Sequence, residues 1–137
     1  MGFQPIILLL DATLAAAVTG ETSAVVAMPS GRVESLTLFA DFVRAAGGTT
    51  AKAWVQTSLD GGTSWMDIAH FAFTTTTAQR AYHLTAAAVT AIAIPTDGTL
   101  GDNTSVNGFL GGLYRVKYTT TGTYTGASSF KIWATAK

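Results

Sequence analysis

The side chains in this chain most capable of acid–base chemistry are two aspartates. Asp41 and Asp67 each lie inside an otherwise apolar run. Two carboxylates held roughly 5–9 Å apart can serve as the acid and base of a glycosidase. Nothing else in the sequence indicates a substrate cleft, so we expect no catalytic residues and no enzyme. Each aspartate is expected to pair with a basic side chain such as Arg44, Arg115 or Lys117.

Histidines and loop carboxylates are the remaining candidates for ligand chemistry. His70 and His83 have no histidine or glutamate at ligand spacing, whereas a zinc site needs three or four converging ligands. Asp97, Asp102 and Asn103 lack the dense acidic spacing of calcium loops. We therefore predict no metal and no cofactor. The histidines are expected in the core or at an interface, and the loop residues in solvated Asx turns.

The segment Ser58–Trp65 fits the pattern S-x-D-x-G-x-[ST]-W, which is known as the Asp-box. It resembles the turn that recurs in sialidase propellers, where its role is structural. The Asp60 carboxylate can cap turn amides, the glycines can adopt positive φ, and Trp65 can cover the turn. A single copy in so short a chain predicts a structural turn.

Composition limits the classes of partner. Charged residues make up 12% of the 137 residues, with 8 basic and 8 acidic side chains scattered along the chain and no cysteine. There is no basic footprint for nucleic acid and no apolar stretch of the ~20 residues that a membrane span needs. A charge-poor surface is typical of proteins packed against copies of themselves or a scaffold.

The elements that position these residues read as strands. Residues 51–59 alternate in polarity, Asp60–Thr63 supplies a tight turn, and residues 65–73 follow as a second strand. About eight or nine short strands separated by turns predict an all-β fold for residues 12–137, with the pattern of a β-sandwich or a jelly roll. Residues 96–112 form a long loop, and Pro29–Gly31 forms a turn.

Two features of this strand pattern suggest contact with another chain. Trp65–Phe73 is apolar at both parities, so this strand must be covered on both sides and self-association is expected. Ile6–Leu10 is an apolar run within an N-terminal arm of residues 1–11. This arm is either an edge strand of its own sheet or a strand added to a neighbour. Asp11 marks a break after the run and slightly favours the second alternative.

Two tryptophans stand on the polar faces of their strands, Trp54 near Lys52 and Trp133 near Lys131. Such a ring is buried by a protein partner, covered by a loop of its own chain, or used to stack a sugar. We favour the protein interface. The residues expected there are Trp54, Trp133, Lys52, Lys131, Arg115, Lys117, Ile7 and Leu9.

Residues 50–137 also resemble a family. The run AWVQTSLDGGTSWMDIAHFAF, the loop PTDGTLGDNTSVNGFLGG and the closing LYRVKYTTTGTYTGASSFKIWATAK are similar to capsid decoration (cement) proteins of tailed bacteriophages that have a jelly-roll fold. The resemblance favours a β-sandwich of jelly-roll type and implies a virion protein on the outer capsid surface, assembled in the host cytoplasm. It would form a homodimer or homotrimer and staple neighbouring subunits of the major capsid protein. The alternative is a tail or head-fibre module that binds host carbohydrate through exposed tryptophans.

Overall fold

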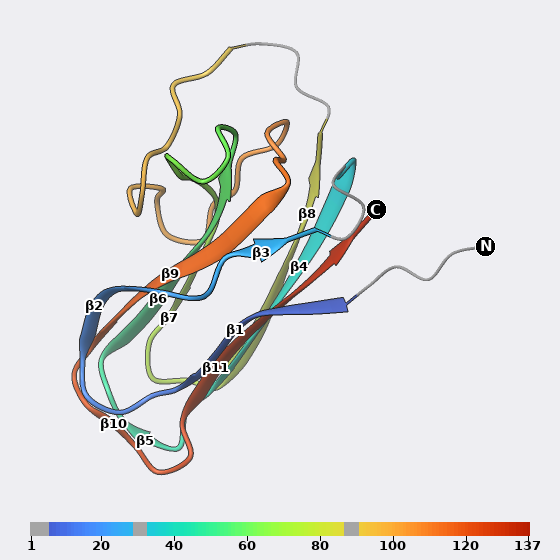
Figure 1. The fold of residues 1–137 in the computed structure, drawn as a ribbon. Coiled ribbons are helices and arrows are strands. Elements are labelled where there is room, and N and C mark those ends of the chain that lie inside the picture. Colours follow the sequence, from blue (N-terminus) through green and yellow to red (C-terminus); the bar gives the residue numbers. More distant parts are fainter. Residues whose placement is uncertain (1–5, 29–32, 87–90) are drawn as a thin grey trace.

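A computed structural model describes residues 6–28, 33–86 and 91–137 of the chain (Figure 1). The described part contains eleven strands and no helix. The predicted turn at residues 29–31 and residues 1–5 of the predicted arm lie outside it. The strands are β1 (Ile6–Thr13), β2 (Val18–Thr22), β3 (Val26–Ala27), β4 (Ser35–Val43), β5 (Ala46–Gly47), β6 (Thr50–Ser58), β7 (Met66–Phe73), β8 (Ala78–Thr85), β9 (Leu113–Thr121), β10 (Tyr124–Thr125) and β11 (Ser129–Ala136).

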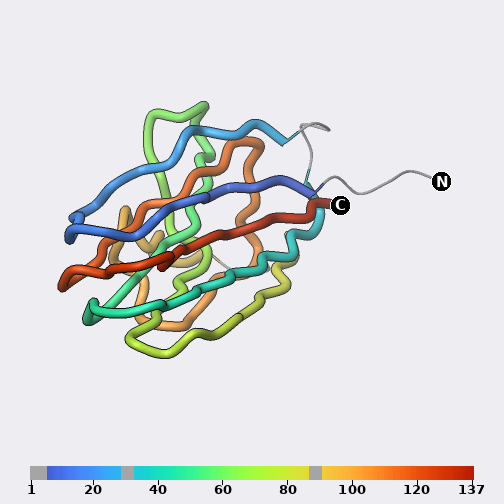
Figure 2. The backbone as a smooth tube through the Cα atoms, turned by 90° about the horizontal axis from the view of Figure 1, so that it is seen from below, coloured from blue at the N-terminus to red at the C-terminus, as the bar shows by residue number. Residues whose placement is uncertain are grey.

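The long strands form two antiparallel sheets. One has the order β1-β11-β4-β8 and the other β2-β9-β6-β7, with the short β3 also paired to β9. Figure 2 shows β1 (blue), β11 (red), β4 (teal) and β8 (yellow-green) side by side in this order. The strands pair as in one long hairpin that is folded into two sheets: β1 pairs with β11, β2 with β9, β4 with β8 and β6 with β7. This order is a jelly roll, as predicted.

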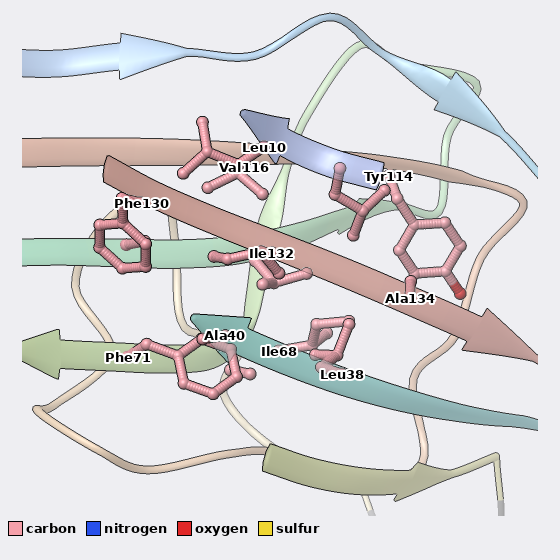
Figure 3. Close-up of a cluster of buried hydrophobic side chains, with 14 of the residues drawn as sticks. Leu10, Leu38, Ala40, Ile68, Phe71, Tyr114, Val116, Phe130, Ile132 and Ala134 are labelled. Carbon is pink, nitrogen blue, oxygen red and sulfur yellow. The ribbon is translucent and has the colours of Figure 1, made fainter. Parts of the chain in front are cut away.

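The core lies between the two sheets. On β4, Leu36, Leu38, Ala40 and Phe42 are completely buried while their neighbours are not, which is the alternation of a strand with one face in the core. Figure 3 shows side chains of β4 and β11 meeting those of β7 and β9 in this space. Phe42 stacks on Phe73 with ring centroids 5.0 Å apart, so aromatic packing continues the core toward one end of the sandwich.

A β-bulge explains why β7 is apolar at both parities. Val55 pairs with Ala69 and Gln56 pairs with Asp67, so Ile68 is an extra residue in β7. A bulge of this kind switches the parity of the side chains that face inward. Ile68 faces the core before the switch, and the odd-numbered side chains from Ala69 onward face it after the switch.

The strand β1 contains a second bulge. Leu8 pairs with Trp133 and Leu10 pairs with Ile132, which leaves Leu9 as the extra residue. The continuous run Ile6–Leu10 is therefore a half-buried strand with a parity switch. The strand forms one edge of its own chain's sheet and continues through Asp11 to Thr13, so the expected boundary between residues 11 and 12 falls inside β1. No helix long and apolar enough to cross a membrane occurs among the described residues.

Candidate functional site

Each sheet has an outer face, and the two faces differ. We call the outer side of β2-β9-β6-β7 the sealed face, because the loop before β9 lies across it. We call the outer side of β1-β11-β4-β8 the open face. Of the residues predicted at an interface, Lys52, Trp54, Arg115 and Lys117 lie on the sealed face, and Lys131 and Trp133 lie on the open face.

The loop covers the sealed face by pairing with the free edge of β7. The amide of Asp67 donates to the carbonyl of Pro95 at 2.8 Å, and the amide of His70 donates to that of Thr104 at 2.9 Å. The amide of Val106 in turn donates to β7 at 2.8 Å. Figure 1 shows this loop, in gold and orange, beside the green turn that joins β6 and β7. The outer face of β7 is thus covered by the loop of its own chain. The apolar content of this strand at both parities therefore gives no reason to expect self-association.

Asp67 holds the loop in place. Its side chain is fully buried, and its carboxylate accepts the backbone amides of Gly98, Thr99 and Leu100 at 2.8–3.0 Å. The side-chain amide of Gln56 also donates to it, at 2.8 Å. A buried carboxylate is tolerated only when it is fully hydrogen-bonded, and here three consecutive backbone amides provide those bonds. The partner expected for Asp67 was a basic side chain, and that expectation was wrong.

Asp97 also binds the loop to the sheet. Its carboxylate accepts hydrogen bonds from Gln56 Nε2 at 2.8 Å and from Lys117 Nζ at 3.1 Å, and Arg115 Nη2 lies 3.4 Å away. The hydrogen bond from Gln56 and the two cations hold the pKa of Asp97 below its ordinary value, against the opposing effect of burial. Arg115 also lies 4.5 Å from the ring of Trp65. Arg115 and Lys117, which were predicted at an interface, therefore form contacts within the chain.

The other two polar loop residues are exposed and lie in a turn, and their side chains also bind the sheet. Asp102 pairs with Lys52 Nζ at 3.0 Å. Asn103 adopts a φ of 53°, and its side-chain oxygen accepts the amide of Ala72 at 3.0 Å. Asp97, Asp102 and Asn103 are therefore exposed turn residues, as expected, but the hydrogen bonds of their side chains go to the sheet rather than to their own turns. Sequence patterns could not show that β6, β7 and β9 lie beneath them.

Trp54 is covered by the same loop. Its indole N–H donates to the carbonyl of Leu100 at 3.0 Å, and its ring stacks on His70 with centroids 4.3 Å apart. His70 is buried, and desolvation lowers its pKa, so the neutral imidazole is favoured. Of the three alternatives for Trp54, the structure shows the ring covered by its own chain. His83, by contrast, is exposed on the open face, where its Nδ1 lies 2.9 Å from Thr37 Oγ1.

The Asp-box turn has the predicted local chemistry. Asp60 accepts the amide of Ser64 at 2.8 Å, and Ser58 Oγ accepts the amide of Gly62 at 2.8 Å. Gly61 and Gly62 adopt φ values of 75° and 97°. Hydrogen bonds from Ser64, chiefly from its side chain, lower the pKa of Asp60 to about 2. The polar groups of the motif are used inside the turn, which fits a structural role.

The arrangement of carboxylates does not form a catalytic pair. Asp41 lies on the open face and Asp67 on the sealed face, so the whole sandwich separates them. Asp41 accepts a hydrogen bond from Gln79 Nε2 at 2.9 Å rather than from a basic residue. No group of three or more acidic or histidine side chains within the described ranges is placed to hold a metal ion.

The open face carries exposed apolar side chains in a row across four strands. Leu8 pairs with Trp133, Trp133 with Phe39, and Phe39 with Ala81, so these residues stand side by side. Leu8 and Phe39 are each 42% exposed, and Trp133 is half-buried with its ring 5.8 Å from that of Phe39. Ile6, 73% exposed, lies beside this apolar row. The open face therefore presents neighbouring apolar side chains to solvent.

A charged row lies next to the apolar row on the open face. Asp11 pairs with Lys131, Lys131 with Asp41, and Asp41 with Gln79. Lys131 thus has a carboxylate on each neighbouring strand. Its ammonium group nevertheless has no ion-pair partner among the described residues.

Sequence patterns located this face only in part. Trp133 and Lys131 were predicted at an interface, and both lie on the open face. Ile7 and Leu9 were also predicted there, but Leu9 is buried and Ile7 packs against the core, so Ile6 and Leu8 are the exposed side chains of β1. Phe39 was not predicted, although its position opposite in parity to Leu38 and Ala40 was a usable signal.

Comparisons of this chain with protein-family models, with curated proteins and with solved structures found no match. Its function is therefore inferred from the geometry of the two faces.

Proposed function

We propose that this chain is a structural virion protein of a tailed bacteriophage that binds the outside of the head shell and staples neighbouring capsid subunits. The observation that carries this proposal is the contrast between the two faces. The sealed face is closed by hydrogen bonds and ion pairs from the chain's own loop. The open face keeps an apolar row and a lysine that has no ion-pair partner among the described residues.

A jelly roll with one open, apolar sheet face is suited to adhesion. Jelly rolls occur in viral capsid proteins, in lectins and in other binding proteins. The polar side chains of the sealed face are engaged in contacts within the fold, and no group of three or more described acidic or imidazole side chains is placed to hold a metal ion. A low charge density lets copies lie close together without strong mutual repulsion. On a shell, many weak contacts add up because the binding sites are repeated.

The carbohydrate-binding alternative now depends on one tryptophan. Trp54 donates its N–H to its own chain and stacks on His70, which leaves it poorly placed to receive a sugar. Trp133 and Phe39 form a tilted aromatic pair on the open face, and such a pair can stack a sugar ring. Under this alternative, Trp133→Ala abolishes glycan binding while Trp54→Ala leaves it intact.

The test is sedimentation of the purified chain with assembled heads that lack it, made from the shell protein of the same genome. We expect the chain to sediment with assembled heads at a fixed ratio and to stay in solution with unassembled shell subunits. If it stays in solution with both while binding a glycan array through Trp133, the fibre alternative replaces the proposal.

A further inference from the structure

We propose that the open face is a homodimer interface in which two copies pack face to face about a two-fold axis parallel to the strands. This goes beyond the proposed function: it names the occupant of the open face in the free protein as a second copy of the chain, which the head shell would displace on binding. The axis lies between β11 and β4, the two central strands of the sheet.

The register of the sheet fixes which residues would meet. A two-fold axis parallel to the strands leaves the position of each residue along the strand direction unchanged and reverses the order of the strands across the sheet. As a result, β11 faces the partner's β4 and β1 faces the partner's β8. Trp133 then faces Phe39 of the other copy, because the two are cross-strand neighbours within one chain. The apolar row is therefore complementary to itself.

Charge complementarity favours the same axis. Lys131 and Asp41 are also cross-strand neighbours, so Lys131 of each copy faces Asp41 of the other, which gives two symmetric ion pairs. Asp11 faces Gln79, so no like charges are opposed in this row. A two-fold axis perpendicular to the strands would instead set the charged row against the row of Ile6 and Thr135, which leaves the lysine unpaired and buries a carboxylate against an aliphatic side chain.

The size of the face fits a modest dimer. Four strands about 4.8 Å apart and eight residues of about 3.3 Å each span roughly 19 by 26 Å, or about 500 Å² before side-chain relief is counted. A standard interface buries about 800 Å² from each partner, so we expect association in the micromolar range. Stacked sheets pack with their strands about 30° apart, which keeps the central pairs in contact and loosens the corners.

The test is a charge swap measured by sedimentation equilibrium of the full chain between about 1 µM and 1 mM. Lys131→Asp or Asp41→Lys alone should raise the dissociation constant about ten- to hundredfold, because each repels its counterpart twice in the dimer. The double variant Lys131→Asp/Asp41→Lys restores opposite charges across the axis and should return the constant to near the wild-type value. Glu21→Lys makes the same charge change on the other sheet and should leave it unchanged.

Circular dichroism and thermal unfolding of each variant at low concentration establish that the monomer is folded. A wild-type chain that stays monomeric at 1 mM overturns the inference, as does a folded double variant that fails to regain association. Dimerisation without binding to heads would overturn the proposed function alone, and binding to heads by a strict monomer would overturn this inference alone.

Discussion

The carboxylate of Asp67 is the point at which one substitution should release the whole loop from the sealed face. Oδ1 accepts Gln56 Nε2 at 2.8 Å and the Gly98 amide at 2.9 Å. Oδ2 accepts the amides of Thr99 at 2.8 Å and Leu100 at 3.0 Å. Asp67→Asn keeps the size of the side chain but replaces one of these acceptors with a donor. With the nitrogen at the Oδ1 position, the Gln56 bond is lost and Gly98 keeps only its 3.0 Å bond to Oδ2; with the nitrogen at the Oδ2 position, the bonds of Thr99 and Leu100 are lost. In either case donors face donors.

The neighbouring network prevents a compensating flip. Gln56 could present its oxygen to the new amide only by turning over, but that oxygen accepts Arg115 Nε at 2.8 Å. Hydrogen bonds to a charged group contribute roughly 1.5–3 kcal/mol each, so losing at least one of them and leaving the others with a neutral acceptor should cost about 3–5 kcal/mol. At this chain length that corresponds to a fall in Tm of roughly 10–20 °C.

The assay combines thermal unfolding with amide hydrogen exchange. We expect the amides of Gly98, Thr99 and Leu100 to lose protection first, while the amides of β4 stay protected up to the new Tm. The matched control is Asp102→Asn, which removes an ion pair between Lys52 and a carboxylate that is 55% exposed and should cost under about 1 kcal/mol. A Tm for Asp67→Asn within about 3 °C of wild type, with those three amides still protected, would refute the reasoning.

Three further outcomes are expected. Burial lowers the pKa of His70 below its ordinary 6.5, so on acidification the unfolded chain binds this proton at a higher pH than the folded chain does. The free energy of unfolding, measured by urea titration, should therefore fall as the pH drops below about 6.5. His70→Gln should flatten that slope. Gly48→Ala should destabilise by about 2–3 kcal/mol more than Gly61→Ala in the same titration, since both have a φ of 75° but only the Gly48 Cβ would overlap the Tyr124 ring; equal costs would contradict this. Deleting residues 1–10 removes two buried leucines of β1 and should cost at least about 3 kcal/mol, whereas a free arm would leave the Tm unchanged.

Local chemistry in the sequence determined most of the strands and one turn. Alternation is a local property, so the strand at residues 50–58 and the core positions of β4 follow from the order of polar and apolar residues alone. The Asp60 turn was equally legible, because its hydrogen bonds link residues within one short motif. The number and spacing of such strands also sufficed to predict an all-β sandwich, whereas the jelly-roll order depends on pairings between distant strands.

The bulges are where sequence patterns misled. An apolar run at both parities has two explanations, a strand covered on both sides or a strand whose inward parity switches. Only the pairing partners distinguish them, and those partners lie on other strands: Val55 and Gln56 for Ile68, and Trp133 and Ile132 for Leu9. The exposed members of β1 were therefore predicted one residue out of step.

Tertiary structure also decided which tryptophan is available. Trp54 and Trp133 look alike in sequence, since each stands among polar neighbours on an alternating strand. A distant loop covers Trp54, with a bond to Leu100 that spans 46 positions. No segment of the described chain lies over Trp133 in the same way. The difference arises because the buried carboxylate of Asp67 binds three consecutive amides of the loop and so holds the loop on one sheet. The sequence of either strand alone does not indicate that contact.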